Sequence, residues 1–344
     1  MVGKLSDMFG RKAFTLAGIL IFVAGSAACG LAPSMPFLIA ARTVQGAGGG
    51  TVGVIQAYVA DATKPEDRSK ALGWLSAATN AGVAIGPAIG SWAMKIGTSG
   101  PGLVAAAITL TNMGFAWKFL TESNELAGKK LGERPVPRKS RDAVRRVVSH
   151  SGEPASRLIW IYGITMGSFQ GMNTILALFL SWRFGVTEDT IGYFFMYVGT
   201  ISFVTRAAFL GKMVDKFGEP RLSRIGMVCL AAGLGGMAAA PTIPLLAAAV
   251  FFVPLGAAFT FPCVTGLLSR VVPQHERGLY MGVQQTFGGV GRFIGPLYAG
   301  FAFDHLGKTV PYYTAAVIVL ATISLGVGIE KSIPPKAPPK PAAA

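Results

Sequence analysis

Ten apolar runs, nine of them at least 20 residues long, divide this 344-residue chain. A helix needs about 20 apolar residues to cross the hydrocarbon core of a bilayer. Charged residues make up only 14% of the chain and the mean hydropathy is +0.51, too little charge for the surface of a soluble domain of this size. We therefore predict an all-α membrane protein with helices over 13–33, 36–60, 71–94, 99–120, 158–182, 188–211, 222–240, 243–268, 279–303 and 309–329.

The chain also repeats itself at an offset of 208 to 209 residues. Segment 3–10, GKLSDMFG, matches segment 211–218, GKMVDKFG, and the tripeptide IGP recurs at 85–87 and 294–296. A repeat this long indicates a duplicated half-protein rather than a solenoid. In an apolar chain, a duplicated half is typical of a secondary transporter with a substrate path between the halves.

The repeat divides the chain unevenly. We predict four helices in an N-terminal half-bundle (1–120), a basic linker (121–157), six helices in a C-terminal bundle (158–329) and a disordered Pro-rich tail (330–344). Two predicted helices precede the motif at residue 211 and none precedes its copy at residue 3. We therefore expect a parent protein of twelve helices whose first two are absent from this sequence.

The positive charges lie mainly in alternate loops. Of 31 Lys and Arg, 24 lie in the segments on one side of the membrane, and only Lys95, Arg183 and Lys308 lie in loops on the other side. This asymmetry predicts that both termini are cytoplasmic. The net charge of +15 is then expected to face anionic lipid headgroups rather than nucleic acid. Within the linker, the valines at 144–148 predict either a short helix on the membrane surface or a solvated segment.

Three motifs carry a resemblance to a known family. Segment 3–12, GKLSDMFGRK, resembles the loop motif between the second and third helices of the major facilitator superfamily. Segment 42–49, RTVQGAGG, resembles its fourth-helix motif, and segment 82–90, GVAIGPAIG, the fifth-helix motif of its drug:proton antiporters, which include tetracycline-efflux-like exporters. The resemblance implies two pseudo-symmetric six-helix halves, a central cavity and alternating access.

The resemblance also implies site residues at the cytoplasmic ends of the helices. Asp7 and Arg11 would form a conformational latch between the halves, although Asp7 alone could simply cap a turn. The second copy has Glu219-Pro220 in place of Arg11-Lys12, which predicts a weaker second latch. The predicted latch consists of Gly3, Asp7, Gly10, Arg11 and Asp215.

Two arginines lie inside predicted helices. A guanidinium within the membrane is costly unless it is paired or faces water. Arg42 either reaches the interface or serves proton coupling, the role that the resemblance implies; Phe251 replaces it in the second copy. Arg292, where the first copy has Val83, is a second candidate for a cavity charge or for binding an anionic substrate group.

Small residues four apart predict close helix packing in the antiporter motif, at Gly82, Gly86 and Gly90, and Pro87 permits a kink. Polar residues in otherwise apolar helices are expected to face the interior, because exposing them to lipid is costly. They are the predicted substrate-cavity residues: Asn80, Gln170, Asn173, Gln284 and Gln285.

All 16 acidic residues fall in loops or at helix ends, so no carboxylate is predicted at a helix centre. In related antiporters an acidic residue often sits on the first helix, which has no counterpart in this sequence. We predict no enzyme activity, no cofactor and no metal site, since neither a catalytic constellation nor a metal-ligand cluster is present.

We predict a monomeric, multi-pass protein of the bacterial inner membrane that exports small amphipathic compounds in exchange for protons. Two alternatives remain open. One is a metabolite facilitator or symporter of the same fold. The other is a non-transporting remnant, or a membrane interaction module that uses the basic linker at 129–146.

Overall fold

The computed structural model describes residues 10–47, 51–64, 67–121, 140–186 and 188–332, in which all regular secondary structure is helical. An N-terminal group contains α2 (Arg11–Gly30), α3 (Met35–Ala47), α4 (Thr51–Ala62), α5 (Arg68–Met94) and α6 (Gly100–Phe119). A short helix, α7 (Ser140–Ser149), follows. A C-terminal group contains α8 (Pro154–Phe184), α9 (Glu188–Val204), α10 (Leu210–Phe217), α11 (Glu219–Ala239), α12 (Ile243–Val271), α13 (Arg277–His305) and α14 (Val310–Gly326).

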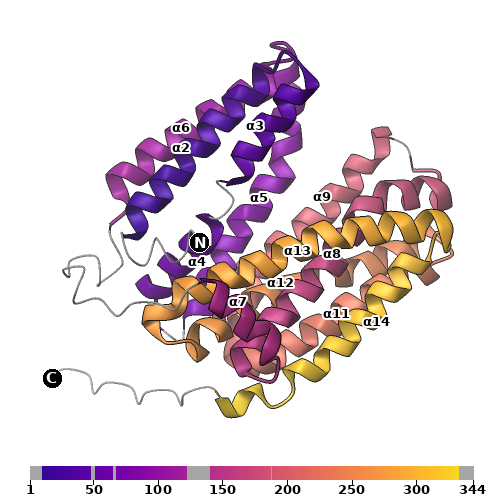
Figure 1. Ribbon diagram of the computed structural model, residues 1–344. Coiled ribbons are helices and arrows are strands. Elements are labelled where there is room, and N and C mark those ends of the chain that lie inside the picture. Colours follow the sequence, from indigo (N-terminus) through magenta and orange to yellow (C-terminus); the bar gives the residue numbers. More distant parts are fainter. Residues whose placement is uncertain (1–9, 48–50, 65–66, 122–139, 187, 333–344) are drawn as a thin grey trace.

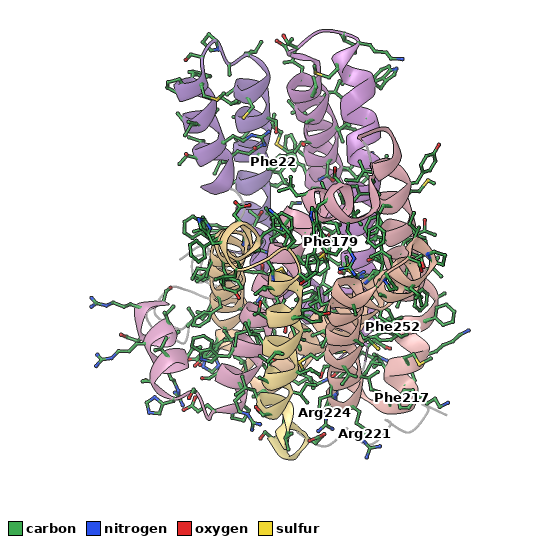
Figure 2. The ribbon with its side chains drawn as sticks, turned by 90° about the vertical axis from the view of Figure 1, so that its right-hand side faces the viewer. Phe22, Phe179, Phe217, Arg221, Arg224 and Phe252 are labelled. Atoms are coloured by element: carbon green, nitrogen blue, oxygen red, sulfur yellow. The ribbon has the colours of Figure 1, made fainter. Side chains whose placement is uncertain are left out.

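The two groups meet at one end and diverge from it. Figure 1 shows α5 and α6 rising away from α8 and α13, while α4 lies beside the start of α13. We call the end where the groups meet the closed end. In Figure 2 Arg221 and Arg224, in the first turns of α11, lie at this end of the C-terminal group, near Phe217 and far from Phe22 on α2.

The repeat in the sequence reappears as equivalent helix contacts. In the N-terminal group α2 packs along α6, and in the C-terminal group their equivalents α11 and α14 pack along each other. Gly10 and Gly218, equivalent at an offset of 208, precede α2 and α11 with φ of 103° and 74°. These positive φ values are accessible to glycine at little cost, which explains why both copies of the motif end in glycine.

The predicted helical run 188–211 continues further than expected. A π-helical turn, Thr205–Phe209, joins α9 to α10, so the helical path extends to Phe217. Within the described residues, four helical paths are long and apolar enough to cross a membrane by length and composition: Arg11–Gly30, Ile191–Phe217, Glu219–Ala239 and Ile243–Val271. Helices such as α5 and α13 carry many glycines and polar residues, which lower their hydropathy although they contain 27 and 29 residues.

Glycines allow α8 and α13 to pack at very short range. A Cβ atom on Gly295 would lie 2.1 Å from the carbonyl oxygen of Gly167, and one on Gly291 would lie 2.4 Å from that of Gly163. Real Cβ atoms do not approach backbone atoms this closely. Glycine at these positions therefore fixes the distance between the two helices, as small residues do in membrane proteins generally.

The linker contains a short amphipathic helix, α7, as one of the two predictions for this segment proposed. Its apolar face is covered by protein rather than by lipid. Ala143 and Val147 of α7 are fully buried against the C-terminal group. Arg146 forms an ion pair with Glu153, at 2.8 Å between Nη2 and Oε1. The hydrogen bond from Arg146 lowers the pKa of the Glu153 carboxyl. These contacts tie α7 to the start of α8.

Candidate functional site

The carboxylate of Asp61, at the end of α4, joins the two helix groups at the closed end. Its Oδ2 lies 2.7 Å from Arg11 Nη2 in the same group, and its Oδ1 lies 2.5 Å from Arg277 Nη1 in the C-terminal group. All three side chains are at most 7% exposed. A buried charge must be paired, and the single carboxylate of Asp61 is shared between one arginine from each group.

Two equivalent arginines bind the C-terminal ends of helices. Arg68 Nε donates to the carbonyl oxygen of Ala60 at 2.8 Å, and Arg277 Nε donates to that of Ser269 at 3.1 Å. Both contacts place a cation at a helix C-terminus, where the helix dipole favours it. Arg68 Nη1 also donates to the Ser269 carbonyl at 3.3 Å, so this arginine also crosses between the groups.

The second copy of the motif keeps its ion pair with the charges exchanged. Glu219 occupies the position equivalent to Arg11, and Arg270 the position equivalent to Asp61. Glu219 Oε2 lies 3.3 Å from Arg270 Nε, and the carboxylate is only 2% exposed. The expectation of a weaker second latch, based on the loss of Arg11-Lys12, missed this compensation because Arg270 lies 51 residues away.

Two further polar contacts cross the closed end. Asp215 Oδ2, a predicted latch residue, lies 3.1 Å from Lys70 Nζ of α5, and the Ser69 hydroxyl donates to Glu219 Oε1. The predicted partners Gly3 and Asp7 lie outside the described residues. The Lys70 and Asp215 side chains are 40% and 62% exposed, so this ion pair contributes less than the buried pairs.

Close backbone contact accompanies these polar bonds. A Cβ atom on Gly266 of α12 would lie 2.1 Å from Ser69 Oγ, and one on Gly53 of α4 would lie 3.4 Å from the Cα of Gly282 on α13. The two groups thus touch along α5–α12 and along α4–α13. This end of the molecule is sealed by packing as well as by charge.

The exchanged pair gives a direct test. Glu219→Arg or Arg270→Glu alone should place like charges together and destabilise the protein by about 3–5 kcal/mol, as expected when a buried pair loses a partner. The double reversal should recover much of that loss because the attraction is restored. Thermal unfolding of the purified protein measures the double-mutant cycle. Additive losses in the double variant would show that Glu219 and Arg270 do not interact.

A second polar group lies deeper along the helices, between α4, α8 and α13. Gln285 of α13 donates through Nε2 to Gln56 Oε1 at 3.0 Å and to the Tyr162 hydroxyl at 3.2 Å. Its Oε1 accepts a hydrogen bond from Arg292 Nη2 at 3.4 Å. We call these four residues the Gln285 cluster. It brings together the predicted residues Arg292 and Gln285 and links both helix groups.

The other predicted cavity residues do not join this cluster. Gln284 is fully buried and accepts a hydrogen bond from Thr265 within the C-terminal group, at 3.3 Å. Gln170 and Asn173 are half-buried on α8. The side chains of Asn80 and Pro87 lie outside those the structure describes.

Arg42 lies on the N-terminal group, near the middle of α3. Its side chain is exposed, and its Nη1 donates to Gln45 Oε1 at 2.9 Å. Gln45 in turn donates to Ser26 Oγ of α2 at 2.8 Å. Arg42 and Arg292 thus share one arrangement, an exposed guanidinium bonded to a glutamine on its own helix.

The glycines of the predicted antiporter motif differ from their copies. A Cβ atom on Gly82, Gly86 or Gly90 of α5 would meet no atom within 4 Å, whereas Gly291 and Gly295 of α13 touch α8. Among the described residues, close packing is therefore seen at the second copy, and packing at Gly82, Gly86 and Gly90 stays a prediction. No described helix stands beside α5 as α8 stands beside α13.

The sequence interpretation missed several residues that the structure brings into these sites. Asp61 was visible only as a carboxylate at a helix end, and its equivalence to Arg270 was the signal that could have revealed it. Gln56 is a polar residue in the predicted helix 36–60, the same signal as the other cavity candidates, and it was overlooked; Tyr162 gave no signal. Arg206 lies in the π-helical turn, where it is buried and donates to Ser76 Oγ of α5 at 3.0 Å. π-helical turns inside longer helices often mark functional positions.

Two related helix groups, joined by charge at one end and diverging at the other, define a multi-pass membrane transporter. A family model described as Major Facilitator Superfamily matches residues 1–208 and, again, residues 158–344. The chain belongs to the major facilitator superfamily, whose members are transporters rather than enzymes. The two overlapping matches agree with the repeat in the sequence.

Named relatives and solved structures agree with this assignment. The chain is 27% identical to Multidrug resistance protein 1 of Bacillus subtilis, over 98% of this chain and 83% of that protein. It is 23% identical to the class B tetracycline resistance protein of Escherichia coli, over 88% of this chain and 75% of that protein. The crystal structure of the human organic anion transporter MFSD10 superposes with a TM-score of 0.83 at 21% identity, over 94% of this chain and 79% of that one.

Proposed function

We propose that this protein exports drug-like or amphipathic organic compounds by alternating access, in exchange for protons. The observation that carries the proposal is the charged closed end, where Asp61 holds arginines of both helix groups while the helices diverge beyond it. A contact made of ion pairs can break and reform, because the released charges are solvated when the groups separate. The names of the drug-resistance relatives favour export as the direction.

The orientation follows from the distribution of charge. We propose that both termini and the closed end face the cytoplasm of a bacterial cell, because the Lys- and Arg-rich loops lie on that side. This conformation is then the outward-facing state of a transport cycle. The protein is proposed to act as a monomer, with its basic loops against anionic lipid headgroups.

The proposed site residues divide into two sets. The latch consists of Asp61, its partners Arg11 and Arg277, and the second pair, Glu219 and Arg270. The charges proposed to respond to substrate or protons are Arg42 and Arg292, one on each helix group.

Transport by everted membrane vesicles tests the proposal. Vesicles that contain the protein should accumulate amphipathic fluorescent dyes when a proton gradient is imposed, and a protonophore should abolish the accumulation. Vesicles without the protein are the control. Accumulation that persists with the protonophore would point to a facilitator instead, and no accumulation of any dye in the panel would contradict drug export.

A further inference from the structure

We infer that the Gln285 cluster is a binding site for the anionic group of the substrate, and that the protein prefers organic anions to organic cations. The inference rests on the proposed transport function and specifies its substrate class. It depends on the placement of Arg292, on the residues that hold its side chain and on the charge of the membrane-spanning helices.

Arg292 lies in the middle of α13, about equally far from Arg277 and His305 at the two ends. A guanidinium at this depth is costly unless it faces water or a partner. Its side chain is exposed, and its Nη2 donates to the neutral Gln285 Oε1 at 3.4 Å. Among the residues that the structure describes, no carboxylate forms an ion pair with it. An exposed, unneutralised charge at mid-helix is typical of a binding position.

The neighbours of Arg292 hold its guanidinium, which itself supplies the hydrogen-bond donors for an anion. Gln285 Nε2 is directed to Gln56 and Tyr162, so the amide is held with its oxygen toward the guanidinium. The Tyr162 hydroxyl is buried and accepts from Gln285, which keeps the amide in this orientation. A guanidinium has five N–H donors, and a carboxylate or sulfonate binds it through two parallel hydrogen bonds. Arg292 can therefore present both charge and donors to one acidic group.

The remaining helix charges favour the same sign of substrate. Arg42 and Arg206 also lie within helices, and both are bonded to neutral side chains, Gln45, Ser202 and Ser76. All acidic residues of the chain fall in loops or at helix ends. A cation that enters between the helix groups would approach arginines without a compensating carboxylate, whereas an anion would neutralise them.

The Gln285 cluster lies on the same helices as the latch, so an anion bound at the cluster can affect the ion pairs at the closed end. Gln56 and Asp61 lie on the same helix, α4, five residues apart. Gln285 and Arg277 lie on α13, eight residues apart. The helix pair that carries the Gln285 cluster therefore also carries the ion pair between the groups. An anion on Arg292 would act on the two helices that the latch joins.

Two dyes with the same xanthene core and opposite charge test the inference: fluorescein, an anion, and rhodamine 6G, a cation. Binding to the purified full chain in lipid nanodiscs is measured by fluorescence polarisation. We expect fluorescein to bind more tightly than rhodamine 6G. Arg292→Gln should weaken fluorescein binding about tenfold or more, the value of a charge-assisted hydrogen bond, without weakening rhodamine binding. Arg292→Lys should retain part of the affinity.

Arg221→Gln is the matched control, because Arg221 is an exposed arginine at the closed end of the C-terminal group. It should leave both affinities unchanged. Thermal unfolding of each variant separates loss of binding from loss of the fold. Tighter binding of rhodamine 6G, equal loss of both dyes in Arg292→Gln, or no dye binding to the unaltered protein would each overturn the inference. Binding without uptake into vesicles would contradict the proposed export and leave the anion site standing.

Discussion

Replacing Asp61 with alanine is expected to open the closed end and to remove most transport. The change leaves Arg11 and Arg277 without the carboxylate that both contact, in a region where all three side chains are buried. Removing one member of a buried ion pair typically costs about 3–5 kcal/mol, because the remaining charge is left without compensation. A loss of this size shifts a two-state equilibrium by more than about a hundredfold.

A cysteine at position 69 provides a probe of this opening. Ser69 of α5 is fully buried against Glu219 and Gly266 of the C-terminal group. In a background with Cys29→Ser, Cys229→Ser and Cys263→Ser, maleimide should label Ser69→Cys slowly when Asp61 is present and much faster in Asp61→Ala.

Asp67→Asn is the control for Asp61→Ala. Asp67 is half exposed and lies 3.8 Å from Lys70 Nζ, so its loss should change stability by only about 0.5 kcal/mol or less. Equal labelling of the Ser69→Cys thiol in Asp61→Ala and Asp67→Asn would mean that Asp61 does not hold the groups together.

Replacing Gly295 with alanine should give the second large effect, a loss of folded protein. The added methyl group would lie 2.1 Å from the carbonyl oxygen of Gly167, a backbone atom that can move only if α8 and α13 separate. Overpacking costs about 1–3 kcal/mol in ordinary cores and more where the backbone must shift. Lower yield of monodisperse protein on size exclusion, together with a lower Tm, measures the effect.

The repeat provides a matched control at Gly86, the equivalent of Gly295. A methyl group on Gly86 would meet no atom within 4 Å. Gly86→Ala should therefore be neutral or slightly stabilising, since alanine is favoured over glycine in a helix by about 1 kcal/mol. A comparable loss in Gly86→Ala would mean that another helix covers this face of α5 in the membrane.

The glycine motifs illustrate what local pattern can and cannot predict. Glycines four residues apart recur at 82–90 and 291–295, and the spacing alone predicts a surface that another helix can approach closely. Only the second copy has a described partner, because Gly163 and Gly167 of α8 lie opposite it. The spacing of the glycines specifies the shape of one helix face, but a close contact also requires a partner helix with a matching face.

For the charged residues, too, the motifs predict which residues take part but not which residues they contact. The resemblance identified Arg11 and Asp215 as latch residues from the motif and its copy. Their described partners, Asp61 and Lys70, lie on other helices, and neither partner follows from the motif itself. The second copy of the motif has Glu219 where the first has Arg11, which suggested a weaker latch. Arg270, at the position equivalent to Asp61, pairs with Glu219 and so keeps the ion pair with the charges exchanged. An ion pair is a property of two positions, so one motif cannot reveal whether its charge is satisfied.

The helical class and the repeat follow from the amino-acid sequence, because both depend on order along the chain: runs of apolar residues long enough for a bilayer, and motifs that recur 208 to 209 residues apart. Which charges meet is seen only in the folded protein. Arg277 reaches Asp61 across 216 residues of sequence, and Gln285 reaches Gln56 across 229. Such contacts depend on how two helix groups dock, and the docking is fixed by packing at glycines and by buried charges far apart in the chain.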